Sequence, residues 1–79
     1  MIRPSSRSAV LSNRECEILE HLAGGQSIGE ISGTLFLSPH TVRTHIKNIL
    51  RKTGTRNRAH AVAVAIGEER IAYQPEAYR

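Results

Sequence analysis

The side chains best able to bind a ligand lie in one stretch, from Ser38 to Lys52. If this stretch is a helix, its spacing gathers on one side His40, Arg43, Thr44, Lys47 and Arg51. Guanidinium, ammonium and hydroxyl groups donate hydrogen bonds to phosphate oxygens and to the acceptor atoms of nucleic acid bases. The chemistry indicated is recognition of a polyanion.

The charges around this stretch have one sign. No acidic residue lies between Glu30 and Glu68, and six basic residues fall in that interval: Arg43, Lys47, Arg51, Lys52, Arg56 and Arg58. A solvated helix face usually mixes charges of both signs, because opposite charges at i,i+4 stabilise it. The missing acids favour a polyanionic partner, although a basic surface that is merely soluble would give the same charge run.

The same stretch carries the signals of a helix over residues 39–53. Ser38 is suited to the N-cap, Pro39 to the first helical position and Gly54 to a left-handed residue after the end. An apolar stripe runs along the side opposite the basic one: Val42, Ile46, Ile49 and Leu50. One face therefore belongs to a core, and the other is exposed.

Length and composition limit the whole chain. Its 79 residues allow one domain and a small core, and the net charge of +4 with a pI of about 10.0 suits nucleic acid. The sequence has no aspartate to phosphorylate, so we expect any input from a missing N-terminal domain, a partner chain or the expression level. Residues 1–10 are interpreted as a flexible tail or linker, compatible with a longer protein and equally with a complete one.

Several functions are argued against. The single cysteine, Cys16, excludes an intrachain disulfide and a Cys-based zinc site, and we assign it to the core. His40 and His45 are five residues apart and so face different ways, which argues against a metal site. His21 and His60 are interpreted as surface residues. We expect no cofactor and no enzyme activity, because the clustered glutamates lie on a capped helix with no pocket implied. Without a membrane span or a signal peptide, the chain is expected in the cytoplasm.

Two shorter helices are predicted before residue 38. Ser12-Asn13-Arg14-Glu15 and Ser27-Ile28-Gly29-Glu30 are both capping boxes, and Gly24-Gly25 ends the first helix. We expect the small side chains of Ser32 and Gly33 to let another helix cross closely. A short helix, a turn at Phe36-Leu37 and a longer basic helix together describe a helix-turn-helix.

A fourth helix is expected over residues 58–66, with Asn57 as N-cap. One apolar face, assigned to the core, comprises Ala59, Val62 and Ile66. A second apolar face, predicted to be a dimer contact, comprises Ala61, Val64 and Ala65. The alternative is that alanine is simply tolerated at the surface. The folded domain should span residues 11–73, with a flexible tail over 74–79.

Together these residues resemble the DNA-binding domain of LuxR-type regulators, also called the GerE-like or NarL/FixJ effector domain. The similarity covers about residues 11–71 and is carried by Leu11-Ser12-x-Arg14-Glu15, Ile18-Leu19, Gly25-x-Ser27, Glu30-Ile31, Leu35-x-Leu37-Ser38, Thr41-Val42-x-x-His45-Ile46, Lys52-x-Gly54 and Arg58. It implies an all-α, four-helix domain with a central helix-turn-helix, in which the fourth helix pairs two protomers. The chain departs from the family pattern at Ile28, Ser32, Thr53 and Thr55.

The resemblance also implies roles for single residues in binding double-stranded DNA. Arg43, Thr44 and Lys47 would face bases. Thr41, Asn48 and Arg51 would meet phosphates, and Ser38 would add a backbone contact at the helix N-terminus. Because arginine can bond O6 and N7 of guanine together, our hypothesis is that Arg43 and Lys47 read bases, while Thr44 contacts a base edge or a thymine methyl.

Two other functions are weighed against this one. A sigma-factor region that reads a promoter element has a similar opening pattern, but Lys52-x-Gly54 and the fourth helix suit a LuxR-type domain better. A protein-interaction antagonist that heterodimerises with a full-length regulator would not need the Arg43 and Lys47 face. We therefore expect a transcriptional regulator that binds as a homodimer to two half-sites about one helical turn apart. It would either contact RNA polymerase or exclude it.

Overall fold

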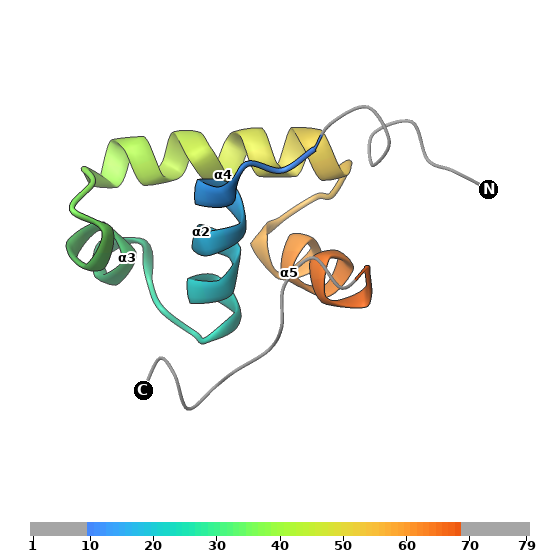
Figure 1. Cartoon of the computed structure of the whole chain (residues 1–79), viewed down its shortest axis with the longest axis horizontal. Coiled ribbons are helices and arrows are strands. Elements are labelled where there is room, and N and C mark those ends of the chain that lie inside the picture. Colours follow the sequence, from blue (N-terminus) through green and yellow to red (C-terminus); the bar gives the residue numbers. More distant parts are fainter. Residues whose placement is uncertain (1–9, 69–79) are drawn as a thin grey trace.

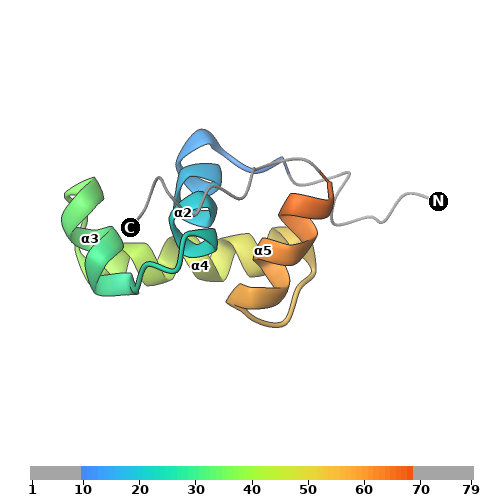
Figure 2. The same ribbon diagram turned by 90° about the horizontal axis from the view of Figure 1, so that it is seen from below.

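The computed structural model describes residues 10–68, which form four helices and, within that range, no strand. The helices are α2 (Asn13–Ala23), α3 (Ile28–Leu35), α4 (Pro39–Thr53) and α5 (Arg58–Gly67). Helix α4 runs along one edge of the molecule, and the other three helices all lie on the same side of α4 (Figure 1). The view from below shows α3, α2 and α5 following one another along α4 (Figure 2). The prediction of an all-α fold with a central helix-turn-helix is confirmed.

Each helix begins at a side chain that the sequence marks as a cap. Both capping boxes form: Ser12 N–H donates to Glu15 Oε1 at 2.8 Å, and Ser27 N–H donates to Glu30 Oε1 at 2.8 Å. Asn57 Oδ1 accepts from the His60 N–H at 2.8 Å and begins α5. A cap of this kind stabilises a helix by roughly 1 kcal/mol. The residue at which each helix begins is therefore determined by its neighbours in the sequence.

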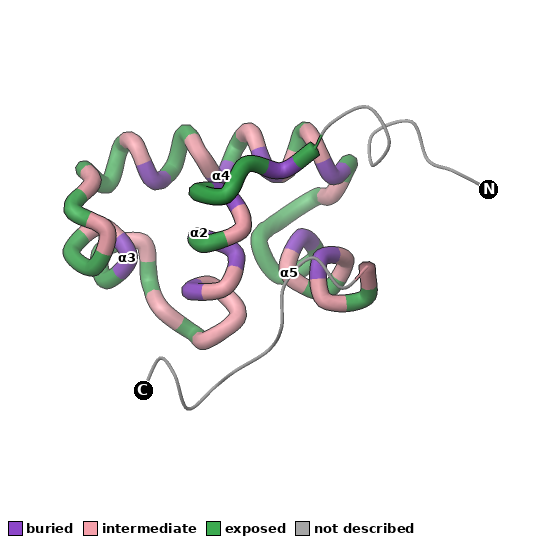
Figure 3. Tube along the Cα trace, in the orientation of Figure 1, coloured by how far each residue is buried: buried purple, intermediate pink, exposed green. Residues whose placement is uncertain are grey.

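The core lies where α2, α4 and α5 meet, and α3 closes it at the N-terminal half of α4. Its buried members are Leu11, Ile18, Leu19, Ile31, Val42, Ile46, Ile49, Ala61 and Ala65. Buried positions recur along α4 between exposed ones (Figure 3). This helix therefore gives one full side to the core and keeps the other in solvent, as its apolar stripe predicts.

The assignment of faces on α5 is corrected by the structure. Ala61 and Ala65 are 1% and 0% exposed and belong to the core of their own protomer, so they do not form a free apolar face. Val62 and Ile66 are only partly buried. Ala61 and Ala65 are small enough to point at the crowded centre, where α2 and α4 both contact this helix, whereas Ala59 and Ala63 are exposed.

The expected close crossing at α3 is also wrong. In the described part of the chain, no heavy atom would lie within 4 Å of a Cβ added at Gly33, so none of the four helices crosses closely at this residue. Ser32 acts in the turn instead, where its hydroxyl donates to the Leu37 carbonyl oxygen. His21, interpreted from sequence as a surface residue, is buried at 8% exposure. Cys16 packs half-buried against the core, as predicted.

The predicted tails at residues 1–10 and 74–79 lie outside the described residues, except for Val10, which is exposed. The expected end of the domain at residue 73 also lies outside them. Within the described range, no helix is long and apolar enough to cross a membrane.

Candidate nucleic-acid interface

The outer face of α4 carries most of the candidate binding residues. Because Val42, Ile46 and Ile49 point into the core, the residues opposite them are turned into solvent. The exposed residues of this face are His40, Arg43, Thr44, Lys47 and Arg51. The structure thus brings together the three residues assigned to bases and the basic phosphate candidate Arg51.

Within residues 10–68, the cations of this face have no acidic partner. The ion pairs found among residues 10–68 join Arg14 to Glu17 and Lys52 to Glu15, and neither involves Arg43 or Lys47. The glutamates of that range lie on α2 and α3, or follow α5. The guanidinium of Arg43 and the ammonium group of Lys47 are therefore available to an external anion.

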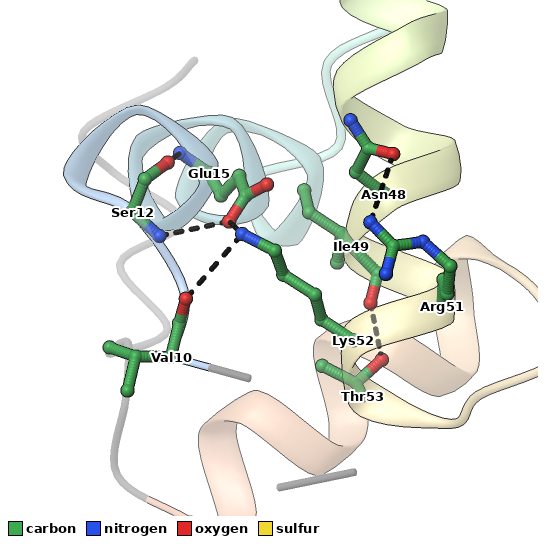
Figure 4. A network of polar contacts seen from close by, with 8 residues as sticks. All are labelled: Val10, Ser12, Glu15, Asn48, Ile49, Arg51, Lys52 and Thr53. Atoms are coloured by element: carbon green, nitrogen blue, oxygen red, sulfur yellow. Dashed lines mark hydrogen bonds and ion pairs between the residues drawn. The ribbon is translucent and has the colours of Figure 1, made fainter. Parts of the chain in front are cut away.

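Arg51 and Asn48 form a pair near the C-terminal end of α4. Arg51 Nη2 donates to Asn48 Oδ1 over 3.5 Å, and both side chains point away from the core (Figure 4). The long contact orients the guanidinium and leaves its other N–H groups for an acceptor outside the protein. Such a geometry suits a phosphate oxygen at the edge of the face.

At the opposite end of α4, two hydroxyls are linked. Ser38 Oγ accepts from the Thr41 N–H at 3.0 Å and donates to Thr41 Oγ1 at 2.9 Å. The Ser38 side chain is thus occupied by capping, whereas the Thr41 hydroxyl keeps its hydrogen for an external acceptor. Pro39 has no N–H, so the His40 N–H is the next backbone donor at this positive helix end.

Lys52 does not belong to this face. Its Nζ lies 2.9 Å from Glu15 Oε1 and 3.5 Å from the Val10 carbonyl oxygen, on the side of α2 (Figure 4). One of the six cations in the acid-free interval is thus neutralised by a carboxylate 37 positions earlier. The basic helix is tied at this end to the start of α2.

Glu15 is only 3% exposed. Burial alone would raise its pKa, but the hydrogen bonds from the Ser12 N–H and from Lys52, together with the Lys52 charge, lower the pKa below its usual value. Glu15 is therefore charged at neutral pH and serves as both a capping group and the partner of Lys52.

The two threonines that depart from the family pattern satisfy each other's hydroxyls. Thr53 is buried, its Oγ1 donates to the Ile49 carbonyl oxygen at 2.8 Å, and it lies 2.8 Å from Thr55 Oγ1. Helices α4 and α5 remain in contact across this position. The departures are accommodated because no hydroxyl is left buried without a partner there.

Two features of the site go beyond the binding roles predicted from sequence. Helical spacing placed His40 on the basic face, in line with Thr44, Lys47 and Arg51, but no DNA contact was assigned to it, and the structure shows it exposed. The neutralisation of Lys52 had no local signal, because its partner is far away in the sequence.

Comparison with known proteins gives a family match over most of the chain. Residues 9–65 match the family model of bacterial regulatory proteins of the luxR family, GerE. The chain is 46% identical over 61 residues to the CsgBAC operon transcriptional regulatory protein of Escherichia coli (strain K12). It is 44% identical over 64 residues to the probable transcriptional regulatory protein NarL of Mycobacterium tuberculosis (strain ATCC 25618 / H37Rv).

These alignments cover 77% and 81% of this chain but only 28% and 30% of the two relatives. A third relative, the nitrate/nitrite response regulator protein NarP of Escherichia coli (strain K12), is 43% identical over 53 residues, which are 67% of this chain and 25% of NarP. The chain thus spans less than a third of the length of these relatives.

Proposed function

This chain belongs to the luxR family of bacterial regulatory proteins, and we propose that it binds double-stranded DNA with α4 in the major groove. The observation that carries the proposal is the outer face of α4, which is exposed and basic and pairs with no acidic residue within the described range. The family is one of regulatory proteins and not of enzymes, in line with the expectation that the chain is not an enzyme.

The dimensions of α4 suit this role. Its 15 residues give a rod of about 22 Å at 1.5 Å per residue, and the major groove of B-DNA admits an α-helix. In this arrangement Arg43 and Lys47 donate to base acceptors, with guanine O6 and N7 as the preferred partners of Arg43. Thr44 meets a base edge or a thymine methyl.

Phosphate contacts would fix the register of the helix. The Thr41 hydroxyl, the Asn48 and Arg51 pair and the backbone amide beside Ser38 flank the base-reading residues from both ends of α4. Such contacts carry no sequence information, but they orient the helix so that the same side chains meet the same bases.

The dimer would form through the outer face of α5, on residues that differ from those first predicted. The exposed residues of this helix are Arg58, Ala59, His60, Ala63 and Gly67, with Val64 half-buried at the edge. Ala59, Ala63 and Gly67 follow one another at four-residue spacing, so a second α5 can approach closely. Two copies would present two α4 helices to half-sites about one helical turn apart.

Such a dimer would regulate transcription from a promoter by contacting RNA polymerase or by excluding it. The named relatives are transcriptional regulatory proteins. Their names support a role in transcription regulation for this chain. The sigma-factor alternative is less favoured because the luxR family match continues into α5. The antagonist alternative gives no reason for the bare basic face of α4.

Selection from a pool of random duplexes tests the proposal. The wild type and Arg43→Ala would be selected in parallel at two salt concentrations. We expect enrichment of a palindromic site by the wild type, and its loss or relaxation in the variant. Equal binding to every duplex, with affinity that only falls as salt rises, would contradict sequence reading and leave a non-specific electrostatic surface.

A further inference from the structure

Phe36 combines two unfavourable features at one position. Its backbone is left-handed, with φ 56°, and it is the one non-glycine residue of positive φ among residues 10–68. Its side chain is 93% exposed, so the ring gains no burial in return. Strained positions that persist without a packing benefit point to a function.

The turn around Phe36 holds the ring in one place. The Phe36 N–H donates to the Ser32 carbonyl oxygen and ends α3. The following N–H, of Leu37, donates to the same oxygen at 3.1 Å, and the Ser32 hydroxyl donates back to the Leu37 carbonyl oxygen. An aromatic side chain on such a fixed base loses little backbone freedom when it binds a partner.

The position of the turn selects among partners. Phe36 precedes the Ser38 cap by two residues, so their Cα atoms are at most about 7.6 Å apart. Helix α5 and Val10 lie at the other end of α4, where Lys52 contacts the Val10 carbonyl (Figure 1). A second copy bound through the outer face of α5 would therefore lie far from the ring. The adjacent basic face of α4 favours DNA.

We propose that Phe36 is an apolar contact to the DNA backbone, with its ring packed on a deoxyribose beside the phosphate held by the N-terminal end of α4. The inference rests on the proposed function, since it needs α4 in the groove. Sugars expose C–H groups between phosphates, and a phenylalanine ring can cover them without a charge or a hydrogen bond. The contact adds affinity without reading sequence.

This contact has a distinct signature. Because it is apolar, its loss should weaken binding to cognate and scrambled duplexes by the same factor, about 10-fold, which corresponds to partial burial of one ring. The slope of log K against log salt should not change, since that slope counts neutralised phosphates. Losing a lysine or arginine phosphate contact would instead make the slope less steep.

The test compares Phe36→Asn with the wild type, because asparagine tolerates a left-handed backbone. Affinities for the selected duplex and for a scrambled one are measured at three salt concentrations, with thermal melting of the free protein alongside. Phe36→Tyr keeps the ring and should bind like the wild type. Val10→Asn removes another exposed apolar side chain, 78% exposed, at the far end of the domain and should also bind like the wild type.

We expect Phe36→Asn to melt at or above the wild-type temperature and yet bind every duplex more weakly, because strain is relieved while a contact is lost. Unchanged affinity in Phe36→Asn would overturn the inference and leave the proposed function intact. A loss confined to one base position would mean a base contact, and a loss of self-association alone would mean a protein contact; either overturns it. If the wild type bound no duplex at all, both proposals would fall.

Discussion

Helices α4 and α5 each give one side to the same core, but their other sides have little in common. The outer face of α4 carries arginine, lysine, threonine and histidine. Beyond Arg58 at its start, the outer face of α5 carries small side chains at Ala59, Ala63 and Gly67 beside His60. Burial is therefore similar in the two helices, and the difference lies in what remains in solvent.

This difference is the basis on which we propose two different partners. A face of unpaired cations gains most from a polyanion, because counterions released from DNA favour association. A face of small side chains gains most from close contact with another helix, because backbones can then approach. We therefore propose DNA as the partner of α4 and a second copy of the chain as the partner of α5.

The largest effect is expected when the α4 face is removed. Arg43→Ala with Lys47→Ala should lower affinity for the selected site by roughly 100-fold or more, because each base contact contributes about 1–3 kcal/mol. Stability should change by less than about 0.5 kcal/mol, since both side chains are exposed and unpaired within the described residues. Fluorescence anisotropy and urea unfolding measure the two quantities. An equal loss of stability would mean that the face is structural.

A charge placed on the outer face of α5 should disrupt the proposed dimer. Ala63→Glu should make the chain monomeric. Binding to a duplex with two half-sites should weaken by about 10- to 100-fold, because in a dimer the second protomer is held near its half-site at an effective concentration in the millimolar range. Binding to a single half-site should be retained. Analytical ultracentrifugation and anisotropy on both duplexes decide this. Retained dimerisation would place the interface on another surface.

Lys52 differs from the cations on the outer face of α4, because its ammonium group pairs with the buried Glu15. Glu15→Gln should destabilise the domain by about 1–3 kcal/mol at neutral pH, through loss of a hydrogen bond between charged groups. The pKa of Glu15 is lower in the folded state than in the unfolded state. Its charged carboxylate therefore stabilises the fold fully above the unfolded pKa of about 4.3, and this stabilisation is lost as the pH falls through the lowered pKa.

Urea unfolding of Glu15→Gln and wild type between pH 7 and pH 2 measures this contribution. The two proteins should differ at pH 7 and converge in acid. Glu17→Gln is the matched control, since Glu17 forms an exposed pair with Arg14 at 3.3 Å and should contribute little at any pH. A constant difference between Glu15→Gln and wild type across the pH range would refute the role of the charge.

The smallest effect is expected at Arg51, which with Asn48 is assigned to phosphate contacts. Arg51→Ala should weaken binding to all duplexes by a few-fold and make the slope of log K against log salt shallower by about 0.9, the value for one phosphate. Titrations at several salt concentrations on cognate and scrambled duplexes provide the check. An unchanged slope would exclude Arg51 from the phosphate contacts.

What could be predicted from sequence depended on the range of each interaction. The helix starts at Ser12, Ser27, Ser38 and Asn57 are set by residues within three positions, so they could be read directly. The apolar stripe of α4 also predicted which face of this helix is exposed. The base and phosphate roles on that face rest on family resemblance, and the structure only supplies their exposure.

The remaining features depend on contacts between distant segments. The rotation of α5 could not be predicted, because this helix is apolar nearly all round and only the packing of α2 and α4 decides which residues face inward. The same holds for Lys52 and Glu15, which are distant in the chain. The turn at Phe36 shows a further limit, since sequence indicated a turn but gave no sign of its left-handed backbone or its exposed ring.

The most direct test of the central claim is the specificity ratio, the affinity for the selected duplex divided by that for a scrambled one at a fixed salt concentration. It would be measured for the wild type, Arg43→Ala and Arg51→Ala. We predict that Arg43→Ala lowers the ratio by about 5- to 100-fold, whereas Arg51→Ala lowers both affinities and keeps the ratio. A ratio unchanged by Arg43→Ala would contradict base reading by the outer face of α4.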